Sequence, residues 1–304
     1  MRYIIGLGEV LFDCLPTGRK LGGAPANFVF HASRFFQEDN TIQGYAVSAI
    51  GKDDFGAEIL DKFNRIGLHY CLPQVEYPTG TVQVTLNEQG VPQYDIRLGA
   101  AWDNIPLTDE ILSIAKGARV ICFGSLAQRS EQSRNAINAI LDAAPADCLK
   151  VFDINLRQHW YNKEVIEQSL QQCNILKIND EELDIIAPML LSVETQTDGL
   201  IAEDRDKTLR VCRALIELYA LKMVILTCGT NGSYVITLDD CSFQPTPKVE
   251  VADTVGAGDS FTGTFVAQLL LGKSIPEAHQ KAVRVSAFVC TQHGPMPTLP
   301  PELL

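Results

Sequence analysis

The chain has 304 residues, of which 46% are hydrophobic and 20% charged, the composition of an ordinary globular protein whose length suits one α/β domain. Its formal net charge of −12 argues against a nucleic-acid backbone or an anionic membrane as partner, because both need clustered Lys and Arg. We therefore expect a small-molecule ligand, with no nucleic acid and no membrane among the partners.

The cysteines and the first residues indicate a cellular location. Nine cysteines are present without any C-x-x-C pair, which fits neither a disulfide framework nor a zinc site. The opening "MRYIIGLGEV" reaches Glu9 before an apolar run of signal-peptide length develops. Both features predict a cytoplasmic protein.

Short apolar runs alternate with segments of helical period along most of the chain. The runs predicted as strands are 3–8, 44–50, 118–124, 149–154, 174–178 and 222–228. The segments predicted as helices are 24–36, 54–66, 131–143, 206–219, 257–271 and 275–292. This alternation predicts one α/β domain over residues 1–304, with a mostly parallel sheet covered by helices on both faces.

Residues 75–98 break this rhythm. They alternate with period two around an "NEQG" turn, so that one face of the predicted strand pair is apolar. Such a pair needs something to cover, and we predict a small β lid over the edge of the sheet. The lid is expected to be inserted at about residues 9–17 and 72–103.

The stretch "VADTVGAGDSFTGTF", residues 251–265, predicts a phosphate site at a helix start. Gly256, Ala257 and Gly258 allow a tight turn that points successive N–H groups at one spot, and helix N-termini attract anions. Asp259 follows in the first turn and would face the phosphate. The alternative is a surface carboxylate that only complements the helix dipole.

Two other phosphate motifs are excluded by their spacing. The Gly-Lys pairs in "GKDDF" and "GKSIP" lack the preceding glycine that a Walker loop requires. A dinucleotide fingerprint fails because Leu11 and Phe261 occupy the third glycine position of "GLGEVL" and "GAGDSF".

A second candidate segment is "KLGGAPANF", residues 20–28. Gly22 and Gly23 permit close backbone approach, and Asn27 offers both a donor and an acceptor. Asp13 adds an acceptor of the kind that binds vicinal sugar hydroxyls. The alternative is a plain loop entering a helix, with Asn27 placed there by chance.

The third candidate is "FDINLR", where Asp153, Asn155 and Arg157 recur at a spacing of two as a strand ends. Side chains at that spacing share one face of a strand, and ligands of open α/β sheets bind at strand ends. An ion pair between Asp153 and Arg157 that only fixes the loop is the competing interpretation.

Two further segments follow predicted strands. Asn179 and Glu182 in "ILKINDEEL" suit a capping box and a magnesium role about equally. Thr227, Gly229 and Gly232 in "LTCGTNGSYV" form, taken alone, a turn of low specificity.

Taken together, these stretches resemble the ribokinase-like sugar kinases, or phosphofructokinase-B family, and most closely its bacterial fructokinases. The motifs that carry the resemblance occur in the family's order: "GLGEVLFDCLP", "GGAPANF", "IGKDDFG", "DINLR", "KINDEE", "TCGTNG" and "DTVGAGDSFTG". The segments "GGAPAN", "GEVLFD" and "GAAWD" favour fructose over ribose. The resemblance implies a three-layer α/β/α fold with a small β lid. Val29, Thr264 and a long connection at 33–47 depart from the family pattern without touching the predicted catalytic residues.

The activity that this resemblance implies is ATP- and Mg²⁺-dependent phosphorylation of the 6-hydroxyl of fructose, giving fructose 6-phosphate and ADP. Ribose, 2-keto-3-deoxygluconate or another small sugar is the alternative substrate. From other classes, we consider a catalytically silent sugar sensor and a nicotinamide oxidoreductase. Intact Asp259 speaks against the first and the failed fingerprint against the second. The chain would act as a monomer or as a homodimer joined through the lid.

The resemblance also implies a role for each candidate residue. Asp259 would be the general base, with the amides of Gly256, Ala257 and Gly258 forming the anion hole. Asp253 and Thr254 would border a K⁺-type cation site. The remaining assignments are sugar binding by Asp13, Gly22, Gly23, Asn27, Asn155 and Arg157, nucleotide binding by Thr227, Gly229, Gly232 and Asn179, and water-mediated Mg²⁺ binding by Glu182.

Overall fold

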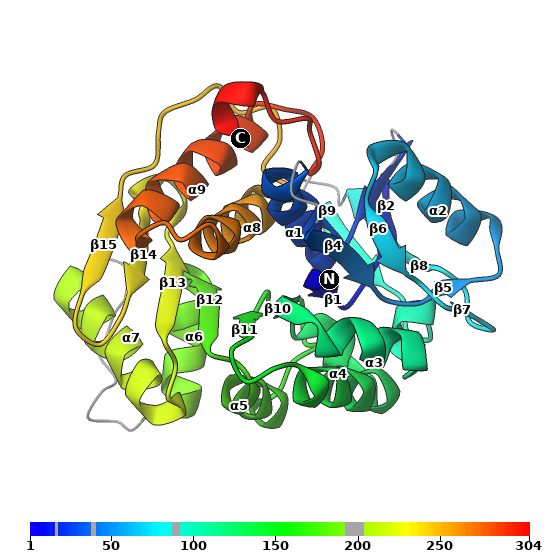
Figure 1. Ribbon diagram of the computed structural model, residues 1–304, viewed down its shortest axis with the longest axis horizontal. Helices are drawn as coiled ribbons and strands as arrows, with labels where there is room; N and C mark the ends of the chain where they lie inside the picture. Colours follow the sequence, from blue (N-terminus) through cyan, green and yellow to red (C-terminus); the bar gives the residue numbers. More distant parts are fainter. Residues whose placement is uncertain (16–17, 38–40, 87–91, 192–203) are drawn as a thin grey trace.

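The computed structural model describes residues 1–15, 18–37, 41–86, 92–191 and 204–304 (Figure 1). These residues form a nine-stranded central sheet in the order β15-β14-β13-β12-β11-β10-β1-β4-β6. Its strands are β1 (Arg2–Leu7), β4 (Ile42–Val47), β6 (His69–Cys71), β10 (Ala118–Phe123), β11 (Leu149–Asp153), β12 (Ile175–Asn179), β13 (Met223–Thr227), β14 (Ser233–Ile236) and β15 (Cys241–Gln244). All neighbours from β6 to β13 are parallel, while β14 and β15 add antiparallel pairs at one edge. The predicted mostly parallel sheet is confirmed.

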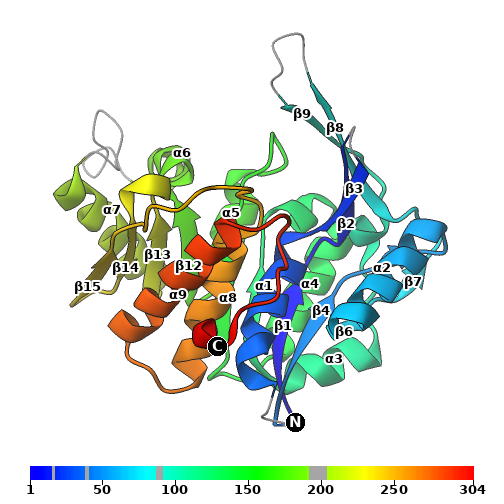
Figure 2. The ribbon, with the colours of Figure 1, turned by 90° about the horizontal axis from the view of Figure 1, so that it is seen from above.

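Helices cover both faces of this sheet, which gives the predicted three layers (Figures 1 and 2). One face carries α1 (Ala24–Ser33), α2 (Asp54–Ile66), α8 (Ala257–Leu270) and α9 (Ile275–Cys290). The other carries α3 (Asp109–Lys116), α4 (Glu131–Ala143), α5 (Lys163–Gln172), α6 (Asp180–Leu190) and α7 (Arg205–Tyr219).

The strand pattern explains why there are two cores. Successive side chains of a strand point to opposite faces, so Ile4 packs with the α1 and α8 side while Ile5 packs with the α3 and α4 side. A parallel sheet buried on both faces needs continuous apolar strands, and "YIIGL" and "VICF" supply them. The helices α3, α5 and α6 lie outside the ranges named from the sequence.

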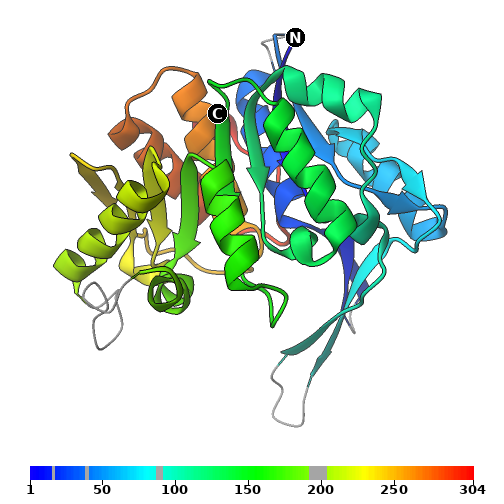
Figure 3. The ribbon, with the colours of Figure 1, turned by 90° about the horizontal axis from the view of Figure 1, so that it is seen from below.

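A second sheet projects from the main body (Figures 2 and 3). Its order is β3-β2-β8-β9, with β2 (Leu11–Leu15), β3 (Gly18–Gly22), β8 (Gly80–Leu86) and β9 (Pro92–Ile96). The "NEQG" turn lies outside the described residues. A third, two-stranded sheet pairs β5 (Ile50–Gly51) with β7 (Gln74–Val75). That the second sheet closes over a ligand stays a prediction.

Within the described residues, no helix has both the length and the apolar character that crossing a membrane requires.

Candidate active site

The helix α8 begins at the glycine-rich turn singled out in the sequence. Gly256 precedes it with φ of 81°, and a Cβ at this position would lie 2.5 Å from the Cβ of Pro295, so the turn requires glycine. Ala257, Gly258 and Asp259 form the first turn, whose N–H groups point out of the helix start. The Ala257 N–H also donates to the Thr254 carbonyl at 3.3 Å, so an anion would compete for it.

Asp259 meets Asn27 across the start of α8 and the first turn of α1. The Asn27 Nδ2 donates to Asp259 Oδ2 at 2.7 Å, although 232 residues separate the two in sequence. Asn27 is buried, and its Oδ1 has no hydrogen-bond partner among the described residues. A side chain near the start of α1 therefore binds the carboxylate in the first turn of α8 and favours its ionised form.

The pKa of Asp259 is raised to about 6. Burial is the largest cause and the neighbouring Asp153 adds to it, while the Asn27 hydrogen bond and the charges of Lys177 and Arg157 oppose the rise. A carboxylate with this pKa is mostly ionised at neutral pH and still accepts a proton readily. Both properties suit a general base.

A buried ion pair between Lys177 and Asp153 lies beside the same turn. Lys177 Nζ is 3.3 Å from Asp153 Oδ1, and a Cβ on Gly258 would lie 3.2 Å from that Nζ. Burial lowers the pKa of Lys177, but the carboxylates of Asp153, Glu182 and Asp259 outweigh it, so the net pKa is raised and the ammonium keeps its charge. The sequence reasoning missed Lys177. Its signal was a lysine inside the apolar run "NILKI", because a buried lysine needs an acidic partner.

The structure corrects both the predicted geometry of "DINLR" and the competing ion pair between Asp153 and Arg157. The strand β11 ends at Asp153 and Asn155 has φ of 41°, so the three polar residues do not line one strand face. The partner of Asp153 is Lys177 rather than Arg157. Arg157 is exposed, and its charge lowers the pKa of Glu9, Asp13 and Asp259 against the effect of burial.

The sugar-side glycines lie where side chains would collide. A Cβ on Gly22 would be 2.7 Å from Asp13 Oδ2, and one on Gly23 would be 2.4 Å from the Glu9 carbonyl oxygen. Gly23 caps α1 with φ of 117°. Burial raises the pKa of Asp13, and the charges of Arg157 and Lys20 oppose that rise. The charge of Arg157 thus lowers the pKa of both Asp13 and Asp259.

Glu9 is a second residue that sequence reasoning missed. Its side chain is buried, and its Oε2 has no partner among the described residues. Burial raises its pKa to about 7. It lines a small cavity together with Phe28, Cys122, Asp153 and Asn155. A lone acid after the first strand carried no sequence signal of its own.

The predicted nucleotide-side residues gather at the ends of β12 and β13. Asn179 and Thr227 are directly paired in the sheet. Gly229 and Gly232 turn the chain toward β14 with φ of 52° and 100°. Asn179 caps α6 in a capping box with Glu182, whose other carboxylate oxygen accepts from the Leu156 N–H at 2.9 Å. The predicted capping box of Asn179 and Glu182 is therefore confirmed.

The residues predicted for cations are engaged in different ways. Asp253 Oδ2 binds the Lys20 ammonium at 2.9 Å and accepts from the Gly294 N–H at 3.3 Å, while its Oδ1 accepts from the Val255 N–H at 3.1 Å. A K⁺ ion at Asp253, next to Thr254, would compete with Lys20. The described residues contain no cluster of three His, Cys, Asp or Glu side chains able to hold a metal ion. A Mg²⁺ ion here would depend largely on phosphate oxygens and water, as it commonly does.

A three-layer α/β fold with a glycine-rich helix start and a buried carboxylate beside it fits a sugar kinase. The chain belongs to the pfkB family of carbohydrate kinases, whose model matches residues 8–302.

Named relatives agree with this family. The chain is 27% identical to probable fructokinase-2 of Arabidopsis thaliana, covering 98% of this chain and 93% of that protein. It is 26% identical to an ATP-dependent 6-phosphofructokinase of Thermoanaerobacterium thermosaccharolyticum, covering 98% and 90%. The crystal structure of Vibrio cholerae fructokinase with fructose, ADP and calcium has a TM-score of 0.74 at 21% identity, covering 97% and 95%.

Proposed function

We propose that this sugar kinase transfers the γ-phosphoryl group of ATP to the 6-hydroxyl of fructose, giving fructose 6-phosphate and ADP. The observation that carries the proposal is the Asp259 carboxylate, which is hydrogen-bonded to Asn27 at the start of α8 and has a pKa near 6. The fructokinases among its relatives support the choice of sugar.

In this proposal the chain's own groups divide the work. Asp259 takes the proton of the attacking hydroxyl, the α8 amides neutralise charge on the transferred phosphoryl group, and Lys177 beside Gly258 adds a positive charge. Bound together with ATP, Mg²⁺ would supply further charge neutralisation. Thr227, Gly229 and Gly232 line the nucleotide side.

Charge on the sugar side favours a neutral substrate. The carboxylates of Glu9, Asp13 and Asp259 surround the position proposed for the sugar, and Arg157 is the cation that acts on all three. An anionic sugar such as 2-keto-3-deoxygluconate or fructose 6-phosphate would meet this negative field. Hydroxyl groups would instead donate hydrogen bonds to it.

Coupled measurement of ADP release tests the substrate with fructose, ribose, 2-keto-3-deoxygluconate and fructose 6-phosphate. We expect fructose to give the highest kcat/KM, and a higher value with any of the others would overturn the assignment. Asp259→Asn should lower turnover by about 10²–10⁴-fold, because a general base is typically worth that factor. Unchanged nucleotide affinity in that variant separates loss of the base from loss of the fold.

The silent-sensor alternative predicts sugar binding without any ADP release.

We also propose that the protein works in the cytoplasm, as a monomer or as a homodimer joined through the second sheet. Light scattering of the wild type and of a variant lacking residues 80–96 distinguishes the two assemblies.

A further inference from the structure

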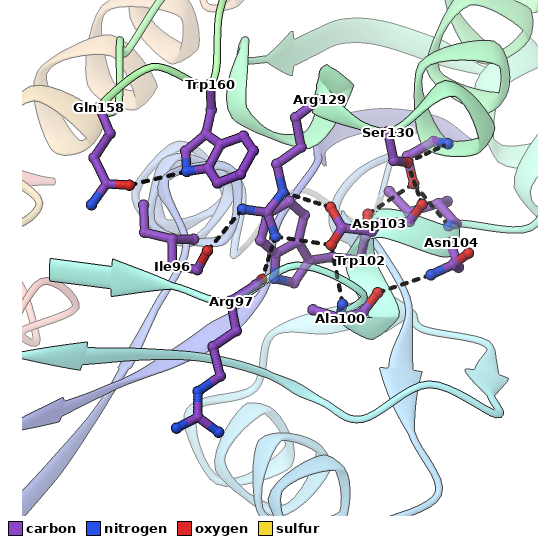
Figure 4. A network of polar contacts seen from close by, with 12 residues as sticks. Ile96, Arg97, Ala100, Trp102, Asp103, Asn104, Arg129, Ser130, Gln158 and Trp160 are labelled. Atoms are coloured by element: carbon purple, nitrogen blue, oxygen red, sulfur yellow. Dashed lines mark hydrogen bonds and ion pairs between the residues drawn. The ribbon is translucent and has the colours of Figure 1, made fainter.

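Arg129 is a buried cation outside the site described above. It ends η3 (Leu126–Arg129), and 2% of its side chain is exposed. Its Nε donates to Asp103 Oδ1 and its Nη2 to Asp103 Oδ2, both at 2.8 Å (Figure 4). Asp103 lies in η2 (Ala101–Asn104), and it also accepts from the Ala100 N–H at 3.0 Å.

The same guanidinium holds the end of the second sheet. Arg129 Nη1 donates to the Ile96 carbonyl at 3.2 Å, and Nη2 donates to the Arg97 carbonyl at 2.5 Å. Ile96 is the last residue of β9, the strand at one edge of that sheet. One planar group therefore ties the base of the second sheet to the main body.

Two tryptophan rings stack on this group. The Arg129 Cζ is 4.0 Å from the Trp102 ring centre and 4.8 Å from the Trp160 ring centre. Trp160 belongs to the loop after β11, and its backbone N–H donates to the Arg157 carbonyl at 3.0 Å. Figure 4 shows the Trp160 ring beside Arg129. Through this ring, the loop that carries Arg157 packs on the cation that binds the end of β9.

We infer that Arg129 is a positioning residue that couples the base of the second sheet to the loop carrying Asn155 and Arg157. This inference rests on the proposed sugar site, of which that loop is one wall. A lysine cannot reproduce the contacts, because it lacks the flat fork that binds Asp103 at two points and reaches two carbonyls at once. Movement of the second sheet then moves Arg157, and a sugar bound by Arg157 favours one position of the sheet.

The two tryptophans of the chain make this coupling visible. Trp102 and Trp160 are the only two in the sequence, so intrinsic fluorescence arises wholly from the rings that flank Arg129. We expect fructose to change the emission of the wild type in a saturable manner. Trp160→Phe should abolish most of that change, and Trp102→Phe should keep it.

Kinetics of Arg129→Lys supply the second readout. We expect KM for fructose to rise about tenfold or more while KM for ATP changes less than about twofold, the pattern of a lost ground-state contact on one substrate only. The matched control is Arg119→Lys, the same chemical change at a solvent-exposed pair with Asp147, which should leave both constants unchanged.

Trp160→Leu guards against a folding defect, because Trp160 is only partly buried and its loss leaves the Arg129–Asp103 pair in place. It should raise KM for fructose in the same selective way. Equal changes in both KM values, or no change in either, would overturn the inference. The inference would also be overturned if the wild-type enzyme phosphorylates fructose but fructose does not change its tryptophan fluorescence. If the enzyme releases no ADP with any of the sugars, that result counts against the proposed function, independently of the fluorescence result.

Discussion

The pH dependence of turnover tests the electrostatics around Asp259 most directly. With a pKa of about 6 in the free enzyme, this carboxylate is mostly ionised at pH 7 and mostly protonated at pH 5. Only the ionised form accepts a proton. We therefore expect kcat/KM to fall about tenfold between pH 7 and pH 5, since kcat/KM follows the groups of the free enzyme.

Two substitutions should move this acid limb in opposite directions. Asp153→Asn removes a like charge that raises the pKa of Asp259, so the limb should move to lower pH. Lys177→Met removes a cation that lowers the same pKa, so the limb should move to higher pH. A charge within about 4–6 Å typically shifts the pKa of a carboxyl group by about one unit or more.

The assay is ADP release with fructose at low concentration, followed in steps from pH 4.5 to 8.5. The matched control is Asp147→Asn, the same chemical change at the exposed partner of Arg119, which should leave the limb where it is. Limbs that move the same way in Asp153→Asn and Lys177→Met would refute the reasoning. An acid limb that survives in Asp259→Asn would show that another group sets it.

Three further substitutions test the turn and the buried acid. Gly256→Ala should destabilise the fold by about 2–4 kcal/mol in urea unfolding, because it combines a left-handed φ with a clash against Pro295. Gly258→Ala should lower kcat with little loss of stability, because its Cβ meets only the end of the flexible Lys177 side chain. Glu9→Gln should be more stable than the wild type at high pH. The folded-state pKa of Glu9 is about 7 and its ordinary value is 4.5, so its contribution is fully present below pH 4.5 and is lost as pH rises through 7. The advantage of Gln should therefore grow with pH to at most about 3 kcal/mol, and a constant difference would contradict this.

Local chemistry made the glycine turn and the helix start predictable. The left-handed Gly256, the first turn of α8 and the capping box of Asn179 each depend on residues a few positions apart, so spacing alone reveals them. The strand and helix ranges followed for the same reason, because periodicity is a local property.

Contacts between distant segments were not predictable in this way. The Asn27–Asp259 hydrogen bond joins the starts of two helices, and nothing in either segment names the other. Lys177 and Arg129 lie in an apolar strand and a short turn, where no period marks them. The prediction that Asp153, Asn155 and Arg157 share one strand face assumed that β11 continues past Asp153. The strand ends at Asp153, and Asn155 has a left-handed φ.

The charges that suit this site to its proposed catalytic role also work against the stability of the fold. Asp259 and Glu9 are both held at raised pKa values, so keeping them ionised at neutral pH costs folding free energy. The two apolar cores on either face of the sheet supply the stability that offsets this cost. The repulsion from Asp153 that makes ionised Asp259 less favourable also brings its pKa closer to 7, where a general base is most effective. Asp153→Asn should therefore weaken the base, and it should also lower the stability of the fold, because it leaves the buried Lys177 ammonium without its acidic partner.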